Sequence, residues 1–384
     1  MVKIGLERIV EERPAWLRDR RLGLLCHQAS VTRDGQHARI ILQQCFGKEL
    51  RLLFSPQHGL FGDKQANMIS STDFIDKVTG LPVISLYGPR LRPEAEHLSE
   101  IEVLLIDLQD VGCRVYTYIW TMLLAMEACA QTGVEVVILD RPNPLGFQME
   151  GPILEEGLFS FVGLAQLPLR HGLTMGELAR YFLVKKKLAL SLRIIEMEGW
   201  QGEFFPETGL PWIMPSPNMP LWETALVYPG QVLLEGTNLS EGRGTTRPFE
   251  IFGAPYLSPD RVKLSLLEIP GVRWYELAFT PTFDKWEGKL CYGFRLEVYR
   301  PYLYEPVFTS LVLLKAIIET HEEFSWRRPP YEFEWQQMPF DIIVGAQDVR
   351  AILQEGSKED LKNLCQKGVR EFQEEIESFR IYNR

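Results

Sequence analysis

The sequence lacks the features that mark exported, membrane-spanning and disulfide-linked proteins. Its first residues contain no charged segment followed by an apolar one, and no stretch of 18 apolar residues occurs in the chain. We therefore expect no signal peptide, no transmembrane helix and a cytoplasmic location. The six cysteines are scattered without a C-x-x-C spacing, which is typical of reduced thiols rather than of a disulfide framework.

Motifs for metals and nucleotides are also missing. The six histidines show no H-x-x-x-H spacing, so the sequence does not indicate a zinc site. No G-x-G-x-x-G follows the first predicted strand, and no other glycine-rich phosphate loop is present. This disfavours a nucleotide-dependent enzyme, and we expect neither a cofactor nor a metal.

The sequence contains fewer basic than acidic residues. The 384 residues include 41 Lys and Arg against 51 Asp and Glu, which gives a formal net charge of −10. An acidic protein is repelled by nucleic acids and by anionic membrane surfaces, so neither is an expected partner. The length is that of two domains or one large one, and the sequence does not indicate an oligomeric state.

The first half of the chain alternates short apolar runs with segments of helical character. Residues 37–44 and 118–131 have helical patterns, and Gly133 suits the end of the second helix. Alternating strands and helices predict a parallel sheet of Rossmann-like layout. The predicted strands are 22–26, 51–54, 82–86, 103–106, 134–139 and 190–195.

The last third predicts a second, smaller α/β domain. Residues 294–299 alternate like a half-buried strand, residues 308–320 suit a helix, and residues 358–380 form a charged amphipathic pattern that predicts one long helix. We therefore expect a Rossmann-like domain over residues 1–255 that carries most of the site, and an auxiliary α/β domain over residues 256–384.

Polar side chains cluster after the predicted strands. Open parallel sheets bind ligands beyond the carboxyl ends of their strands, so these loops are expected to form one site. Structural roles remain open for several of them: a lone His is often structural, an Arg can pair with an Asp, and a Tyr can pack instead of stacking on a sugar. The candidates are Gln57, His58, Gln109, Asp110, Arg114, Tyr116, Tyr118, Arg141 and Asn143.

Two later segments add candidates. Residues 211–220 form a proline-punctuated loop that contains Asn218, and long loops of this kind are often lids or binding loops. Thr174 and Glu177 have the spacing of a capping box, for which the structural role is favoured.

The densest polar run is residues 235–246, EGTNLSEGRGTT. Its glycines allow a close backbone approach to a ligand. Arg243 can grip a carboxylate with two hydrogen bonds, and Asn238 can bind hydroxyls. Glu235 or Glu241 can act as an acid or base if burial raises its pKa. The alternative is a polar turn whose charges pair with each other.

Taken together, these segments resemble the NamZ-type exo-β-N-acetylmuramidases, formerly a family of unknown function. The two longest matching motifs, DLQDVGCRVYTY and EGTNLSEGRGT, are specific, and the resemblance covers nearly the whole chain. The matching segments are SPQHG (55–59), SLYG (85–88), DLQDVGCRVYTY (107–118), DRPNP (140–144), HGLTMGELA (171–179), PSPNMP (215–220), EGTNLSEGRGT (235–245), PFEIFGAP (248–255) and FTPTFDKWEGKLCYGF (279–294).

The resemblance implies a Rossmann-like domain and an auxiliary C-terminal domain, with the site in the cleft between them and no metal or nucleotide. It implies removal of terminal N-acetylmuramic acid from the non-reducing end of peptidoglycan fragments, here as part of cell-wall recycling. Many members carry Glu where this chain has Gln57, and Asn where it has His27. If that Glu is catalytic, this chain lacks it, and the alternative is a non-catalytic protein that binds muropeptides or amino sugars.

Glycoside cleavage usually needs two carboxyl groups, roughly 5–5.5 Å apart for retention or 6.5–9.5 Å for inversion. Our hypothesis makes Glu241 and Asp110 this pair, with Glu235 as the substitute. A cluster of Arg114, Arg141 and Arg243 would attract the anionic sugar, with Arg114 and Arg243 on its lactyl carboxylate. Asn238 and His58 would bind hydroxyls. On this hypothesis, Glu241→Gln abolishes cleavage and leaves folding intact.

Overall fold

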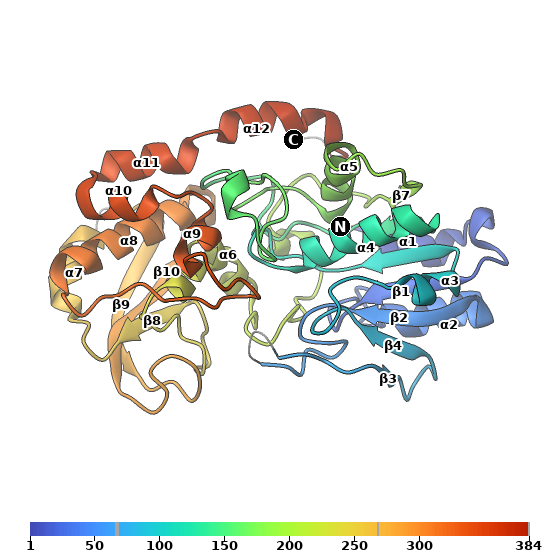
Figure 1. The fold of residues 1–384 in the computed structure, drawn as a ribbon, viewed down its shortest axis with the longest axis horizontal. Helices are drawn as coiled ribbons and strands as arrows, with labels where there is room; N and C mark the ends of the chain where they lie inside the picture. The colour runs from blue at the N-terminus through green and yellow to red at the C-terminus, as the bar shows by residue number, and fades with distance from the viewer. Residues whose placement is uncertain (66–68, 267–268, 383–384) are drawn as a thin grey trace.

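The structure is a computed structural model that describes residues 1–65, 69–266 and 269–382. It contains a seven-stranded sheet built from the first half of the chain and a three-stranded sheet built from the second half. Figure 1 shows the two sheets side by side, each with its own helices. This arrangement confirms the predicted Rossmann-like layout with a second, smaller α/β unit.

The large sheet has the strand order β3-β4-β2-β1-β5-β6-β7. All neighbouring strands are parallel except β3, a two-residue strand that pairs antiparallel with β4 at one edge. The chain moves from β1 toward one edge and then returns to start β5 on the other side of β1. Its strands are β1 Leu22–Cys26, β2 Leu50–Ser55, β3 Phe74–Ile75, β4 Pro82–Ser85, β5 Val103–Asp107, β6 Glu135–Leu139 and β7 Leu192–Ile195.

Both faces of the sheet centre are buried, because successive side chains of the central strands enter different hydrophobic clusters. The short edge strand β3 is exposed. In β5, Leu104 and Ile106 join one cluster, and Val103 and Leu105 join the other. Helices cover both faces, as in other open parallel sheets. Helices α1 Gly5–Glu12 and α2 Ala38–Phe46 pack on one side, and α3 Ala95–Ser99, α4 Tyr118–Thr132 and α5 Met175–Lys185 on the other.

The predicted capping box of α5 is confirmed. The Thr174 hydroxyl accepts a hydrogen bond from the Glu177 backbone N–H at 3.2 Å, and the Glu177 carboxylate accepts one from the Thr174 backbone N–H at 3.0 Å. The predicted end of α4 at Gly133 is also confirmed, since Gly133 has a φ of 74°.

The small sheet is antiparallel, with the order β8-β10-β9. Its strands are β8 Ile251–Ala254, β9 Val272–Phe279 and β10 Cys291–Val298. The buried helix α8 packs against α6, α7, α10 and α11. The helices of this part are α6 Trp222–Gln231, α7 Pro259–Leu266, α8 Pro306–Thr320, α9 Pro339–Val344, α10 Val349–Glu355, α11 Lys358–Gln366 and α12 Val369–Ile376.

The prediction of one long helix over residues 358–380 is wrong. The helix breaks between α11 and α12 at Lys367 and Gly368, where Gly368 takes the left-handed conformation with a φ of 75°. The break redirects α12 toward the first sheet, and Figure 1 shows it passing over to α5. There Arg380 pairs with Glu177 at 3.0 Å and the Tyr382 hydroxyl donates to Asp140 at 2.7 Å.

Residues 380–382 therefore pack against the domain in which the chain began. The predicted division at 255/256 lies between β8 and its sheet partners β9 and β10, and it stays a prediction. In the part of the chain that the structure describes, no helix is both long and apolar enough to cross a membrane. All six cysteines are free thiols.

Candidate active site

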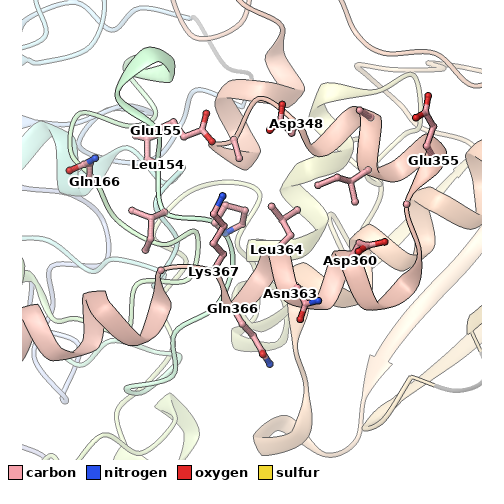
Figure 2. Close-up of a pocket in the computed structure, with 17 residues that line it drawn as sticks. Leu154, Glu155, Gln166, Asp348, Glu355, Asp360, Asn363, Leu364, Gln366 and Lys367 are labelled. Carbon is pink, nitrogen blue, oxygen red and sulfur yellow. The ribbon is translucent and has the colours of Figure 1, made fainter.

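Two cavities that differ in volume and in lining residues are relevant to the location of the site. Figure 2 shows the larger one, a groove of about 1010 Å³ between residues 152–155 and helices α10 and α11. None of the candidate side chains from the sequence lines this groove. The candidate residues therefore meet elsewhere.

Six of the predicted residues meet in a second, much narrower cavity of about 30 Å³. It lies beyond the carboxyl end of β2 and the start of α4, and the proline-punctuated loop, α6 and residues 331–332 complete its wall. The predicted residues that line it are Gln57, His58, Tyr116, Tyr118, Asn218 and Arg243. Val115, Thr117, Val162, Ser216, Met219, Tyr228, Phe249, Tyr331 and Glu332 complete the lining.

Arg243 holds two buried carboxylates beside this cavity. Its Nη2 donates to Glu235 at 2.7 Å, and its Nε lies 3.2 Å from a Glu241 oxygen. The other Glu241 oxygen lies 2.6 Å from the Lys285 ammonium group. The Tyr331 hydroxyl donates to Glu235 at 2.7 Å. The run 235–246 thus contains internal charge pairs, as the structural alternative expected, and also reaches the cavity through Arg243.

These contacts keep Glu235 ionised. Burial favours the neutral acid, but the Arg243 guanidinium and its hydrogen bond outweigh burial and lower the pKa of Glu235. The two glycines around Arg243 make the arrangement possible. Gly242 and Gly244 have φ values of 79° and 75°, and a Cβ on Gly242 would lie 2.3 Å from the Ile251 carbonyl oxygen.

Gln57 links both halves of the molecule across the cavity. Its Oε1 accepts from the Thr117 hydroxyl at 2.6 Å, and its Nε2 donates to Tyr87 at 3.0 Å and to Glu332 at 3.3 Å. The Tyr87 hydroxyl also donates to Glu332, at 2.7 Å. A carboxamide does not ionise, so Gln57 serves as a hydrogen-bonding group.

Glu332 is a cavity residue that sequence reasoning missed. It belongs to the segment between α8 and α9 and does not follow a parallel strand in the sequence. The expectation that ligands bind beyond the carboxyl ends of parallel strands (the strand-end rule) therefore gave no reason to select it. Its side chain is buried, and burial raises its pKa to about 7. Nearby Glu235 also raises this pKa, while hydrogen bonds from Tyr87 and Gln57 and the charge of Arg243 act in the opposite direction.

His58 and Asn218 are fixed by backbone contacts. His58 has a φ of 70°, and its Nδ1 lies 2.6 Å from the Lys64 carbonyl oxygen. Burial lowers the pKa of His58 to about 4, so the imidazole is neutral at pH 7. Asn218 donates to the Gln65 carbonyl at 3.1 Å. Tyr116 and Tyr118 contact each other edge to face at 4.7 Å, so these two rings both pack together and face the cavity.

Two of the three predicted arginines lie outside the cavity wall. Arg114 is fully buried and donates to four backbone carbonyls, those of Pro152, Leu167, Ile343 and Val344, at 2.7–2.9 Å. Arg141 forms a two-point ion pair with Asp107, the last residue of β5; its Nη2 lies 2.9 Å from Oδ2. The structure therefore brings only Arg243 of the expected arginine cluster to the cavity.

The remaining candidates bind neighbouring loops. Asp110 accepts from the Gly112 N–H at 2.6 Å and contacts His171 at 3.1 Å. The Gln109 amide donates to the carbonyls of Asp110 and Pro142, and Asn143 donates to that of Leu173. Asn238 accepts from Tyr256 at 2.7 Å. Asp110 and Glu241 therefore have different partners, and neither lines the cavity. Their role as the catalytic pair stays a prediction.

No group of three His, Cys, Asp or Glu side chains within the described residues is arranged to hold a metal ion.

Comparison with known proteins decides the family. Sequence models described as the N-terminal and C-terminal parts of the exo-β-N-acetylmuramidase NamZ match residues 22–223 and 226–382. The chain belongs to the NamZ family. It is 39% identical to the peptidoglycan β-N-acetylmuramidase NamZ of Bacillus subtilis (strain 168), over 99% of this chain and 91% of that protein.

Two solved structures share the fold of this chain over nearly their full length. Two DUF1343 family proteins of Bacteroides fragilis match 100% of this chain and 99% of theirs, with TM-scores of 0.86 and 0.80 at 30% and 28% identity. The two NamZ sequence models meet between residues 223 and 226, just after the start of α6. The cavity of this NamZ family member is lined by residues from both regions.

Proposed function

We propose that this chain is a glycoside hydrolase that releases terminal N-acetylmuramic acid from the non-reducing end of peptidoglycan fragments. The nearly full-length similarity to a protein named peptidoglycan β-N-acetylmuramidase supports the substrate class. We further propose that the substrate is a small muropeptide or amino sugar and that the protein acts in the cytoplasm, in cell-wall recycling. Six free cysteines suit a reducing compartment.

One observation carries the proposal: two buried carboxyl groups near one cavity have pKa values moved in opposite directions. Arg243 lowers the pKa of Glu235 against the effect of burial, while burial raises the pKa of Glu332 to about 7. Enzymes that cleave glycosides use one ionised carboxylate and one carboxylic acid, and opposite environments create that division. Tyr116, Tyr118 and Tyr228 add aromatic faces suited to a sugar ring.

We assign recognition of the lactyl carboxylate to Arg243, because it is the one of the three predicted arginines that lines the cavity. Arg243 and Lys285 balance the charges of Glu235 and Glu241. Neutral donors such as Asn218 must therefore contribute to binding an anionic sugar, and a protonated Glu332 avoids repelling it.

The test compares 4-nitrophenyl β-N-acetylmuramide with 4-nitrophenyl β-N-acetylglucosaminide, which lacks only the lactyl group. We expect turnover of the first and little or none of the second. No turnover of either, or equal turnover of both, contradicts the proposal. Gln57 in the cavity favours one alternative, a non-catalytic binding protein, and calorimetric binding of the muramide without release of nitrophenol would support it.

A further inference from the structure

The segment that carries Glu332 is held over the cavity in a costly backbone conformation. Glu332 and Phe333 are consecutive non-glycine residues with φ values of 44° and 65°. Such conformations are unfavourable for residues with a side chain and persist where the surroundings enforce them, often at functional sites. The Phe333 ring packs against Tyr87 at 5.5 Å and Phe161 at 6.1 Å. The second region of the chain is thereby anchored on the first, with Glu332 facing the cavity.

Glu332 differs from the other carboxyl groups of the site in its partners. Glu235 and Glu241 are paired with Arg243 and Lys285. Within the described residues, no Arg, Lys or His side chain forms an ion pair with Glu332. It accepts hydrogen bonds from the Tyr87 hydroxyl at 2.7 Å and the Gln57 amide at 3.3 Å, and its side chain is 3% exposed.

The charged groups that face Glu332 favour its acid form near neutral pH. Burial and the negative charge of Glu235 raise its pKa, and the more distant Arg243 only partly offsets them, so the pKa is about 7. The phenol groups of Tyr228 and Tyr331 and the imidazole of His58 are neutral at this pH, because burial raises the pKa of both tyrosines and lowers that of His58. A general acid works best with a pKa near the working pH.

We propose that Glu332 is the proton donor to the leaving group of the glycosidic bond. This inference rests on the proposed function. The Glu332 carboxyl gives its proton to the glycosidic oxygen as the bond between that oxygen and C1 breaks. The bonding electron pair stays with the oxygen, which leaves as the hydroxyl of the shortened fragment. A water molecule supplies the new hydroxyl at C1, and its remaining proton restores the carboxylic acid.

The size of the cavity indicates how Glu332 reaches its substrate. The volume of about 30 Å³ admits roughly one water molecule, whereas pockets for small organic ligands measure about 300 Å³ or more. The wall must therefore move before a sugar binds. Tyr331 and Glu332 form the part of the wall contributed by the segment between α8 and α9. When this segment closes over a bound glycoside, it would place the Glu332 carboxyl against the glycosidic bond.

The experiment uses two substrates that differ in their need for an acid. The leaving group of 4-nitrophenyl β-N-acetylmuramide departs without protonation, whereas that of the disaccharide N-acetylmuramyl-β-1,4-N-acetylglucosamine needs a proton. For Glu332→Gln we expect kcat/KM on the disaccharide to fall by at least about 100-fold. For the aryl substrate we expect kcat/KM to fall by less than about 10-fold. The decrease in disaccharide cleavage as the pH rises through about 7 should also disappear.

Glu334→Gln is the matched control, because Glu334 lies in the same segment and accepts from the backbone of Gln336 and Gln337 outside the cavity. It should keep both activities, and thermal unfolding should show that both variants are folded. Equal losses on the two substrates would indicate a role limited to holding the segment and would overturn the proposal. If Glu332→Gln keeps its activity on both substrates, the proposed role of Glu332 is overturned, whereas the proposed function of the protein is not. A wild-type protein inactive on both substrates contradicts the proposed function and this inference with it.

Discussion

Arg243 lies between the cavity and the buried carboxylate of Glu235, with its Nη2 at 2.7 Å from Oε1. Both side chains are almost completely buried, at 9% and 3% exposure. The pair therefore has two consequences. It fixes Glu235 as an anion, and it makes the stability of this region depend on a residue that also faces the ligand.

Replacing Arg243 by Met should destabilise the protein strongly, because Glu235 would remain as an uncompensated buried charge. We expect the free energy of unfolding to fall by about 3–5 kcal/mol, measured by denaturant titration. Arg370→Met is the matched control, since Arg370 pairs with Glu374 on the surface at 87% and 70% exposure, and it should change stability by less than about 1 kcal/mol. Equal stability of the two variants would contradict a buried, energetically coupled pair.

Glu241→Gln should impair activity without abolishing it. Glu241 holds Arg243 and Lys285 in place, so its replacement should lower kcat/KM on the aryl muramide by about 10- to 100-fold through misplacement of Arg243. Stability should fall by about 2–3 kcal/mol, less than for Arg243→Met, because Lys285 keeps the carbonyl acceptors of Leu234 and Thr237. Complete loss of turnover in a protein of unchanged stability would instead support our original hypothesis of a catalytic Glu241.

Much of the fold could be predicted because local patterns are strong in a buried parallel sheet. Six of the seven strands of the large sheet are short, mainly apolar runs, and Gly133 and Thr174 mark helix ends by their own chemistry. The two-residue edge strand β3 was not predicted, because its exposed side chains form no such run. The break between α11 and α12 was missed because the amphipathic pattern continues through it. Gly368 was the available signal, since its left-handed conformation ends the first helix.

The site could be predicted only in part, because sequence shows residue types and not their partners. The strand-end rule led to Gln57 and His58, which line the cavity. It selected Arg114 equally well, although the tertiary fold turns that side chain toward four carbonyls. Glu332 comes from a segment more than 270 residues after Gln57, and nothing local indicates that the fold brings the two side chains within 3.3 Å.

Arg114→Met should affect folding and leave substrate recognition unchanged. Arg114 joins residues 152 and 167 to residues 343 and 344 through their carbonyl groups, and its loss would remove four hydrogen bonds from buried acceptors. We expect the free energy of unfolding to fall by at least about 3 kcal/mol. Below its unfolding temperature, the variant should keep the wild-type KM for the aryl muramide. A large rise in KM with little change in stability would show that Arg114 binds the substrate.

Glu150 should make the protein less stable as the pH rises toward neutrality. Burial raises its pKa from 4.5 to about 7, against the effect of the hydrogen bond from the Phe308 N–H at the start of α8. Between these two pH values the folded state binds a proton that the unfolded state has released. The contribution is therefore complete below about pH 4.5 and is lost as the pH rises through 7.

In Glu150→Gln this contribution is absent at every pH. The difference in unfolding free energy between pH 5 and pH 8 should shrink by about 2–3 kcal/mol, and the dependence that remains should come from Asp140 and Glu332, whose pKa values burial also raises to about 7. Urea titrations at several pH values measure it. The control is Glu319→Gln, an exposed position on helix α8, and this variant should keep the full wild-type dependence of stability on pH. If Glu150→Gln also keeps the wild-type pH dependence, Glu150 is ionised in the folded protein between pH 5 and pH 8. The nearby Arg170 guanidinium must then balance the charge of Glu150.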